Sequence, residues 1–250
     1  MKKIILLVFG FLPLLLPTKN IFAQGVRVND AAFRAWYILT GTTHIGGKFN
    51  LFHDFHFRRS DLGANPQQTL LRAGLLYDAN DKVQVGGGFV HVWTYPYGEY
   101  PQKNVNEENR LWQQVQIKQP IGKFTLFQRY RLEQRWIGSA SLGGFQTPRF
   151  ENRARFMGRL NLPIPTSEGK ISFYANIFDE VFINFGDEVA RNIFDQNRIG
   201  GNFGIKFNKN ISLELGYIFQ TLARRAQLAT TGQDIFEQNS TFTTSLVSKF

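Results

Sequence analysis

The stretch Lys123–Trp136 reads KFTLFQRYRLEQRW, and apolar and polar side chains alternate along most of it. One set of alternate positions carries Phe124, Leu126, Tyr130, Leu132 and Trp136, and the other carries Arg129, Arg131, Glu133 and Arg135. Successive side chains of a β-strand point to opposite faces, so a period of two predicts a strand. We therefore expect this segment to form a strand with one apolar face and one charged face.

From Lys48 onward the same alternation recurs, and Gly, Asn, Asp or Pro residues mark the breaks. No segment carries a comparable helical stripe. The candidate strands are Phe33–Gly41, Lys48–Arg58, Gln68–Asp78, Val83–Thr94, Asn109–Lys118, Lys123–Trp136, Phe150–Leu162, Lys170–Val181, Asn197–Phe207, Ile211–Thr221 and Ser240–Phe250. The pattern thus predicts an all-β protein.

The connections between these segments alternate in length. Residues 78–82, 119–122, 163–169 and 208–210 are tight connections, whereas 95–108, 137–149, 182–196 and 222–239 are long. Short periplasmic turns alternating with long outer loops are typical of an antiparallel barrel in the bacterial outer membrane. Because such barrels use an even number of strands, we expect about 12. Residues 24–30 or a long loop would supply the missing strand, and ten would suffice if Phe33–Gly41 did not span.

A soluble exported sandwich or lipocalin-like barrel would also alternate, but its polar face would meet bulk water, where Lys serves as well as Arg. Here the polar faces are rich in Arg, as in Arg153, Arg155 and Arg159. In a closed membrane barrel, inward Arg and Glu pair across a wet lumen while apolar side chains face lipid. Closure also removes unpaired strand edges. We therefore favour the outer-membrane barrel.

The N-terminus has the features of a secretory signal. Met1–Lys3 is positively charged and Ile4–Leu16 is apolar, which is too short for a membrane anchor of roughly 20 residues. We predict cleavage after Ala23, which makes residues 1–23 the signal peptide and residues 24–250 a single barrel domain in the outer membrane.

Composition excludes several classes of function. With 43% hydrophobic and 19% charged residues, the chain is not a disordered tail. The absence of cysteine excludes thiol nucleophiles, Cys-ligated zinc and iron–sulfur clusters. A net charge of +10 with many aromatic residues could suit single-stranded nucleic acid. Export and the dispersion of Arg along alternating strand faces argue against a nucleic-acid partner.

Several segments resemble one family of exported proteins. They are Tyr77, Gly86–Phe89, Asn106–Arg110, Trp112–Gln114, Arg129–Arg135, Asp179–Phe182 and Phe194–Arg198. This set resembles the family known as domain of unknown function 2490, and the likeness covers Trp36 to Phe250. The resemblance implies an outer-membrane barrel. It implies no activity and carries over no catalytic residue.

The chain offers no arrangement with workable catalytic or metal-binding spacing. Membrane lipid hydrolases of the barrel type commonly place a Ser two residues after a His. None of the four histidines has a Ser at that position. The residues two positions after His44, His53, His56 and His91 are Gly46, Phe55, Arg58 and Trp93. Hydrolase, zinc-protease and nucleotide-binding motifs are also missing.

Gly86–Gly88 lies inside a strand, where glycine marks a bulge or a close approach. His53 and His56 fall on opposite strand faces, so they do not form a metal clip. We predict that the protein is not an enzyme and needs no cofactor or metal.

The remaining candidate is the inward charge set. Ten arginines, Arg58, Arg72, Arg110, Arg129, Arg131, Arg135, Arg153, Arg155, Arg159 and Arg198, share the polar side with Asp54, Glu133, Glu151, Glu180 and Glu214. We interpret this set mainly as a structural ion-pair network in the lumen. The alternatives are a narrow channel or binding site for anionic solutes, in which Arg131→Glu would weaken anion selectivity, and a lipid-modifying enzyme.

The C-terminal strand suggests one partner of the protein. A final strand ending in Phe250 resembles the signal read by the bacterial barrel-assembly machinery, although Ser248 stands where that signal usually carries an aromatic residue. We expect a monomer embedded in outer-membrane lipid, with small anionic solutes as the other candidate partners.

Overall fold

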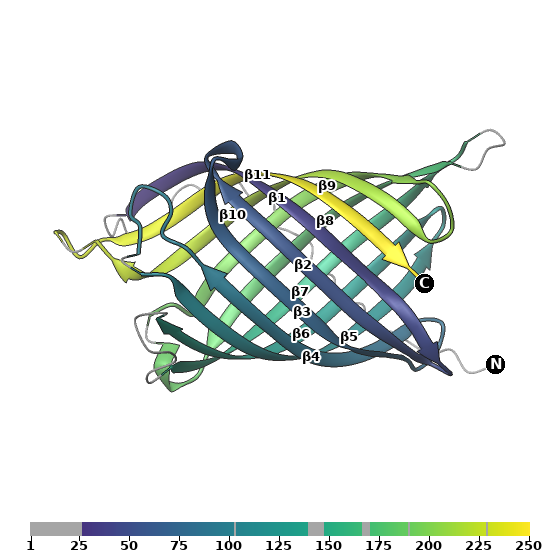
Figure 1. The fold of residues 1–250 in the computed structure, drawn as a ribbon, viewed down its shortest axis with the longest axis horizontal. Coiled ribbons are helices and arrows are strands. Elements are labelled where there is room, and N and C mark those ends of the chain that lie inside the picture. Colours follow the sequence, from purple (N-terminus) through teal and green to yellow (C-terminus); the bar gives the residue numbers. More distant parts are fainter. Residues whose placement is uncertain (1–26, 103, 140–147, 167–170, 190, 229) are drawn as a thin grey trace.

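The computed structural model describes residues 27–102, 104–139, 148–166, 171–189, 191–228 and 230–250, which form one closed β-barrel (Figure 1). The strands are β1 (Arg27–Gly46), β2 (Phe49–Ser60), β3 (Asn65–Asp78), β4 (Val83–Thr94), β5 (Asn106–Ile121), β6 (Phe124–Ser139), β7 (Arg149–Ile164), β8 (Ser172–Phe185), β9 (Phe194–Lys206), β10 (Ile211–Gln227) and β11 (Asp234–Lys249). The predicted all-β barrel is confirmed, and the strand count is close to the expected 12. The predicted signal peptide, residues 1–23, lies outside the described residues.

Each of the eleven predicted segments falls on one described strand. Residues 24–30 were considered for an additional strand. Their described part, residues 27–30, belongs to β1 and forms no separate strand. The described parts of the long loops add no strand either. Neither described helix, each a 3₁₀ turn of three residues, is long and apolar enough to cross a membrane.

The odd number of described strands determines how the barrel closes. Neighbours in the sequence pair antiparallel, so β1 and β11 run in the same direction and pair parallel, from Arg27 opposite Asp234 to Thr42 opposite Lys249. Both strands begin at the end of the barrel that carries the long loops (Figure 1). The expectation of an even count therefore does not hold for the described chain, because parallel closure accommodates an odd one.

The alternation of short and long connections holds only in part, because the strands continue into the predicted long loops and residues 61–64 alone join β2 to β3 at the same end. In the segment predicted as loop 222–239, β10 continues to Gln227 and β11 begins at Asp234. At the other end, Asn80 tightens the turn between β3 and β4, because its side-chain oxygen accepts from the backbone N–H of Lys82 and Val83 at 2.9 and 3.0 Å.

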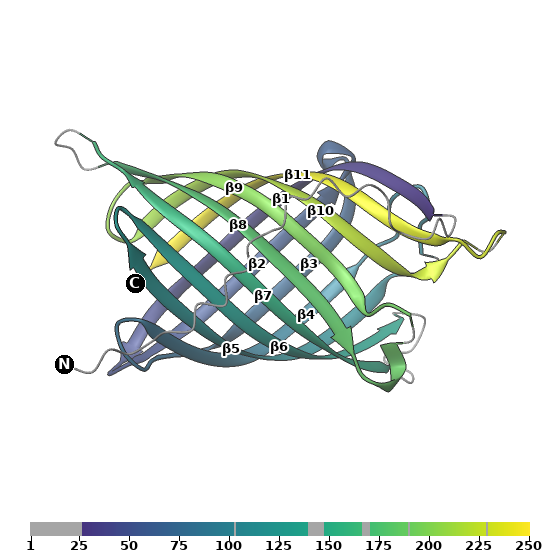
Figure 2. The same ribbon diagram turned by 180° about the vertical axis from the view of Figure 1, so that it is seen from behind.

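The two faces of each strand lie as the alternation predicts. On β6, Tyr130 and Leu132 are 43% and 38% exposed on the outside, whereas Arg131 and Glu133 are 4% and 0% exposed inside. Figure 2 shows the strands β5 to β9 that form the wall behind the view of Figure 1.

Part of the interior is apolar. Leu70 and Leu76 of β3, Val90 and Val92 of β4, and Trp112 of β5 form one buried cluster. A Cβ on Gly74 would lie 2.5 Å from the Trp112 ring, so only glycine leaves room for this indole. Gly88, opposite Gly74, would likewise place a Cβ against the backbone of Ala73. The glycine run thus serves close approach, one of the two roles predicted for it.

Candidate functional site

The inward charges of β6 and β7 meet around Glu133. Arg153 lies opposite Glu133 in the strand register, and its Nε donates to the Glu133 carboxylate at 2.9 Å. Arg155 donates to the other oxygen of the same carboxylate at 2.6 Å. Glu133 is fully buried, and two guanidinium groups therefore share one carboxylate inside the barrel.

Further ion pairs lie on both sides of this centre. Arg135 donates to Glu151 at 2.7 Å and to Glu108 at 2.5 Å. On the other side, Arg155 and Arg129 both donate to Glu180, at 2.8 and 2.7 Å. The structure thus joins most of the predicted charge set into two adjacent ion-paired groups, one around Glu108 and one around Glu133, which together form an ion-paired wall from β5 to β8.

Two carboxylates of this wall escaped the sequence prediction. Glu108 was assigned to a loop because β5 was expected to begin at Asn109, but the strand begins at Asn106 and Glu108 also bonds Arg110 at 2.9 Å. Asp195 has the parity of an outward residue. A bulge between β8 and β9 turns it inward, where it accepts from Arg153 at 2.8 Å.

Four predicted arginines, Arg58, Arg131, Arg159 and Arg198, form no ion pair with any described residue. Arg131 instead donates to the side-chain oxygen of Gln114 at 3.1 and 2.6 Å. The lumen therefore contains cationic groups without a bound carboxylate.

A cavity of about 1010 Å³ lies along the lumen beside the ion-paired wall. Its lining includes residues near both ends of the barrel, such as Tyr97 at the long-loop end and Lys249 at the short-turn end. Of the predicted site residues, Arg110, Arg129, Arg135, Glu151, Arg153, Arg155, Arg159, Glu180 and Arg198 line it. Arg131 and Glu133 do not, because Arg131 packs against Trp112 and Glu133 lies beneath its partners.

A second charged cluster, not predicted from the sequence, lies at the long-loop end. Arg34 of β1 and Glu237 of β11 form an ion pair of 2.5 Å, and Arg224 of β10 also bonds Glu237. The Tyr97 hydroxyl, from the loop after β4, donates to Glu237 at 3.3 Å. Burial, together with the Glu237 carboxylate, raises the pKa of this hydroxyl, which keeps it protonated as a donor. The loop is thereby tied to strands on another part of the wall.

The histidines lie on both sides of the barrel wall. His56 points inward and contacts Asp54 at 2.9 Å, whereas His53 points outward. The His53 ring nitrogen lies 3.3 Å from the Ser248 hydroxyl, above Gly41, on the outer face near the short-turn end. Sequence spacing missed this pair because the two residues come from β2 and β11. Within the described chain, no group of three His, Asp or Glu residues is arranged to hold a metal ion.

A model of a protein family matches this chain over residues 33–231, and its description is protein of unknown function, DUF2490. No curated protein and no solved structure matches the chain. The family match covers well over half of the sequence, including β2 to β9 and the ion-paired wall. The chain therefore belongs to the DUF2490 family.

Proposed function

We propose that the protein is an integral barrel of the bacterial outer membrane that gives small anionic solutes a narrow path. In this proposal the ion-paired wall stiffens the barrel, and the cavity beside it carries the solute. The observation that supports a path most directly is the elongated cavity, whose lining includes arginines without an ion-pair partner, such as Arg58 and Arg198.

The outer surface supports the membrane location. Large apolar side chains point outward from many of the strands, for example Phe33, Leu75 and Ile177, which are 57%, 50% and 64% exposed. Soluble monomers rarely expose apolar surface on this scale. The shortest strands have 12 residues, which exceeds the roughly 9–11 that a tilted strand needs to span a bilayer.

Aromatic pairs near both ends of the barrel fit the two membrane interfaces. Phe49 and Tyr77 pack at 5.1 Å near the short-turn end, and Trp136 and Phe150 pack at 5.2 Å beside a long loop. Girdles of aromatic residues flank the apolar band of outer-membrane barrels at both interfaces. We expect the short turns on the periplasmic side and a monomer, because the closed sheet leaves no free strand edge.

Expressed from its full sequence in a Gram-negative cell, the protein is expected to fractionate with the outer membrane. Its unboiled form should migrate differently from the boiled form in SDS gels, because the closed hydrogen-bonded ladder resists the detergent. We also propose that the terminal strand binds the barrel-assembly machinery through Phe250, so Phe250→Ala should reduce the amount of heat-modifiable protein. Recovery of the wild-type chain from the periplasm without detergent would contradict the location.

The contact between His53 and Ser248 makes lipid modification the second candidate function. A Ser beside a His on a lipid-facing surface is a candidate nucleophile and base. Two features argue against turnover. No described carboxylate or amide hydrogen-bonds His53 to orient its ring. The backbone N–H of Lys249 and of Phe250 are already bonded to Asn210 and Thr42, so they cannot stabilise an oxyanion.

We therefore propose that the protein is not an enzyme, and we expect no fatty-acid release when the purified barrel is incubated with labelled phospholipid or lipopolysaccharide. A Ser248→Ala variant should give the same background signal, as should Ser240→Ala, whose hydroxyl also faces outward and bonds Tyr217. Hydrolysis by the wild type that Ser248→Ala abolishes and Ser240→Ala retains would establish the enzyme instead.

A further inference from the structure

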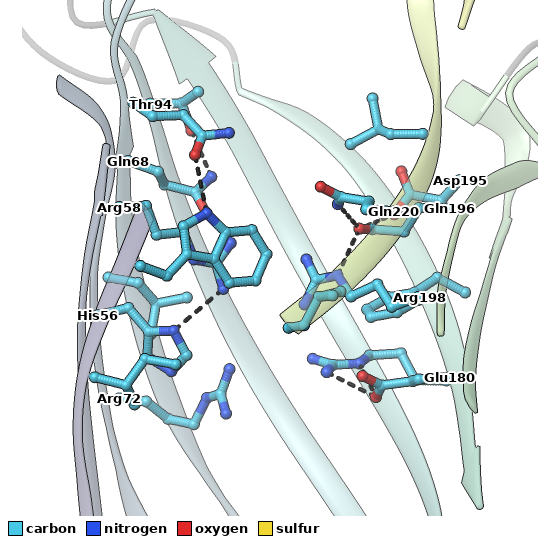
Figure 3. Close-up of a pocket in the computed structure, with 18 of the residues that line it drawn as sticks. His56, Arg58, Gln68, Arg72, Thr94, Glu180, Asp195, Gln196, Arg198 and Gln220 are labelled. Atoms are coloured by element: carbon cyan, nitrogen blue, oxygen red, sulfur yellow. Dashed lines mark hydrogen bonds and ion pairs between the residues drawn. The ribbon is translucent and has the colours of Figure 1, made fainter. Parts of the chain in front are cut away.

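We propose that Arg58 of β2 and Arg198 of β9 together bind one oxyanion group, a carboxylate or a phosphate, of a small solute in the lumen. This site rests on the proposed anion path and gives it a defined point of recognition. Figure 3 shows Arg58 and Gln68 on one side of the cavity and Arg198, Gln196 and Gln220 on the other, so a solute between them can reach both guanidinium groups.

Both arginines are held in place by neutral partners. Arg58 donates to the side-chain oxygen of Gln68 at 2.6 Å, and Gln68 in turn donates to Thr94 at 2.8 Å. Arg198 donates through Nε to the side-chain oxygen of Gln196 at 3.0 Å. Amide oxygens orient a guanidinium group but do not neutralise it. Each side chain is therefore preorganised and keeps its positive charge for another ligand.

Both guanidinium groups lie close to the ring of Trp36. The guanidinium carbons of Arg58 and Arg198 lie 4.0 and 5.0 Å from the centre of the Trp36 ring. The indole is itself buried and fixed, since its N–H donates to Gln67 at 3.1 Å. A shared aromatic ring attracts both cations and holds them near each other despite their repulsion.

The local charge balance favours an anion. Arg58 forms no ion pair with a described residue, and Asp54 is a buried carboxylate on the same strand. Asp54 is already paired with Arg72 at 3.0 Å. Glu180, the carboxylate that acts most strongly on Arg198, already bonds Arg155 and Arg129. The nearby carboxylates are thus engaged, and the two guanidinium groups lack a counter-charge.

Both arginines keep N–H groups that no described residue uses. Arg58 bonds Gln68 through one terminal nitrogen at 2.6 Å and His56 through the other at 3.3 Å, and each of these nitrogens carries a second N–H. Neither terminal nitrogen of Arg198 bonds a described residue, and Arg198 lines the cavity. A bound carboxylate or phosphate would supply both acceptors and negative charge, and guanidinium groups match these anions in shape.

The test is isothermal titration of the purified, detergent-solubilised barrel with sodium phosphate and, separately, with sodium succinate. We expect at least one of the two probes to bind the wild type. Arg58→Gln and Arg198→Gln should each weaken binding about tenfold or more, as expected for loss of one charge-assisted contact. Arg159→Gln is the matched control, because Arg159 also lines the lumen without an ion pair but lies on β7 against Phe127. It should change binding less than about twofold, the scatter expected of a site that it does not touch.

Folding is checked separately, and we expect both glutamine variants to keep the heat-modifiable band because neither breaks an ion pair. If one does not fold, the other still tests the site. The proposal fails if neither probe binds the wild type, or if Arg159→Gln weakens binding as much as the site variants do, since that would indicate a diffuse lumenal field. Binding that depends on Arg58 and Arg198 without any conductance in lipid bilayers would keep the site and reject the path. Anion conductance with unaltered binding in both variants would keep the path and reject the site.

Discussion

Replacing Glu133 with alanine is expected to destabilise the folded barrel by about 3 kcal/mol, near the lower end of the cost of breaking a buried ion pair. The carboxylate is fully buried and serves both Arg153 and Arg155. Without this carboxylate, the two confined guanidinium groups lose a shared negative partner and repel each other. The cost stays near the lower end because Arg153 keeps Asp195 and Arg155 keeps Glu180. Urea unfolding in lipid vesicles measures the change.

The matched control for this variant is Glu107→Ala. Glu107 points outward from β5 at the long-loop end and forms no ion pair with a described residue. We expect its replacement to leave the unfolding free energy within about 0.5 kcal/mol of wild type, as for an ordinary surface change. A second variant, Glu133→Met with Arg155→Met, removes a charge of each sign, leaves Arg153 paired with Asp195 and Glu180 paired with Arg129, and should recover part of the loss. If Glu133→Ala and Glu107→Ala unfold alike, the wall does not stabilise the barrel.

Reversing the charge of two cavity-lining arginines is expected to weaken the anion selectivity of the barrel strongly, because the cavity lining loses much of its excess of cationic side chains. Wild-type protein in planar lipid bilayers should pass anions preferentially, because rings of cationic side chains favour anions in a pore. In Arg159→Glu/Arg198→Glu, two positive charges without ion-pair partners become negative within the cavity lining. The reversal potential in a salt gradient should therefore move toward zero.

The control variant for this experiment has the same change of net charge, but at positions outside the lumen. Lys82→Glu/Lys209→Glu alters two exposed residues in short turns, and its selectivity should remain anionic. Arg131→Glu, first expected to alter selectivity, should instead affect folding, because Arg131 is 4% exposed and packs against Trp112 outside the cavity lining. Cation selectivity of the wild type, or the same shift in the Lys control, would exclude the cationic lumen as the selectivity filter.

Local alternation was sufficient to predict the wall of the barrel. In Arg131-Leu132-Glu133, the parity alone placed the charges inside and Leu132 outside, as found. The period of a strand fixes the face of every residue once one face is known, and the register then brings Glu133 opposite Arg153. That much of the site follows from residues on adjacent strands.

Alternation could not show where strands begin or bend. The outer parts of β10 and β11 lack the apolar outward face of a membrane segment, so Glu237 was assigned to a loop. Asp195 points inward only because a bulge adds one residue to β9. Such changes of parity depend on the partner strand, and the sequence of a single strand does not record them.

The sequence by itself therefore determined the barrel class and the inward arginines, because both depend on local periodicity. Only the tertiary structure decided that the described strands number eleven and close in parallel, that Arg131 packs against Trp112, and that Arg58 and Arg198 both lie beside the Trp36 ring. Contacts across a barrel depend on strand number, tilt and side-chain packing together. These quantities are set by closure of the whole sheet, so they cannot be predicted from the sequence of any single segment.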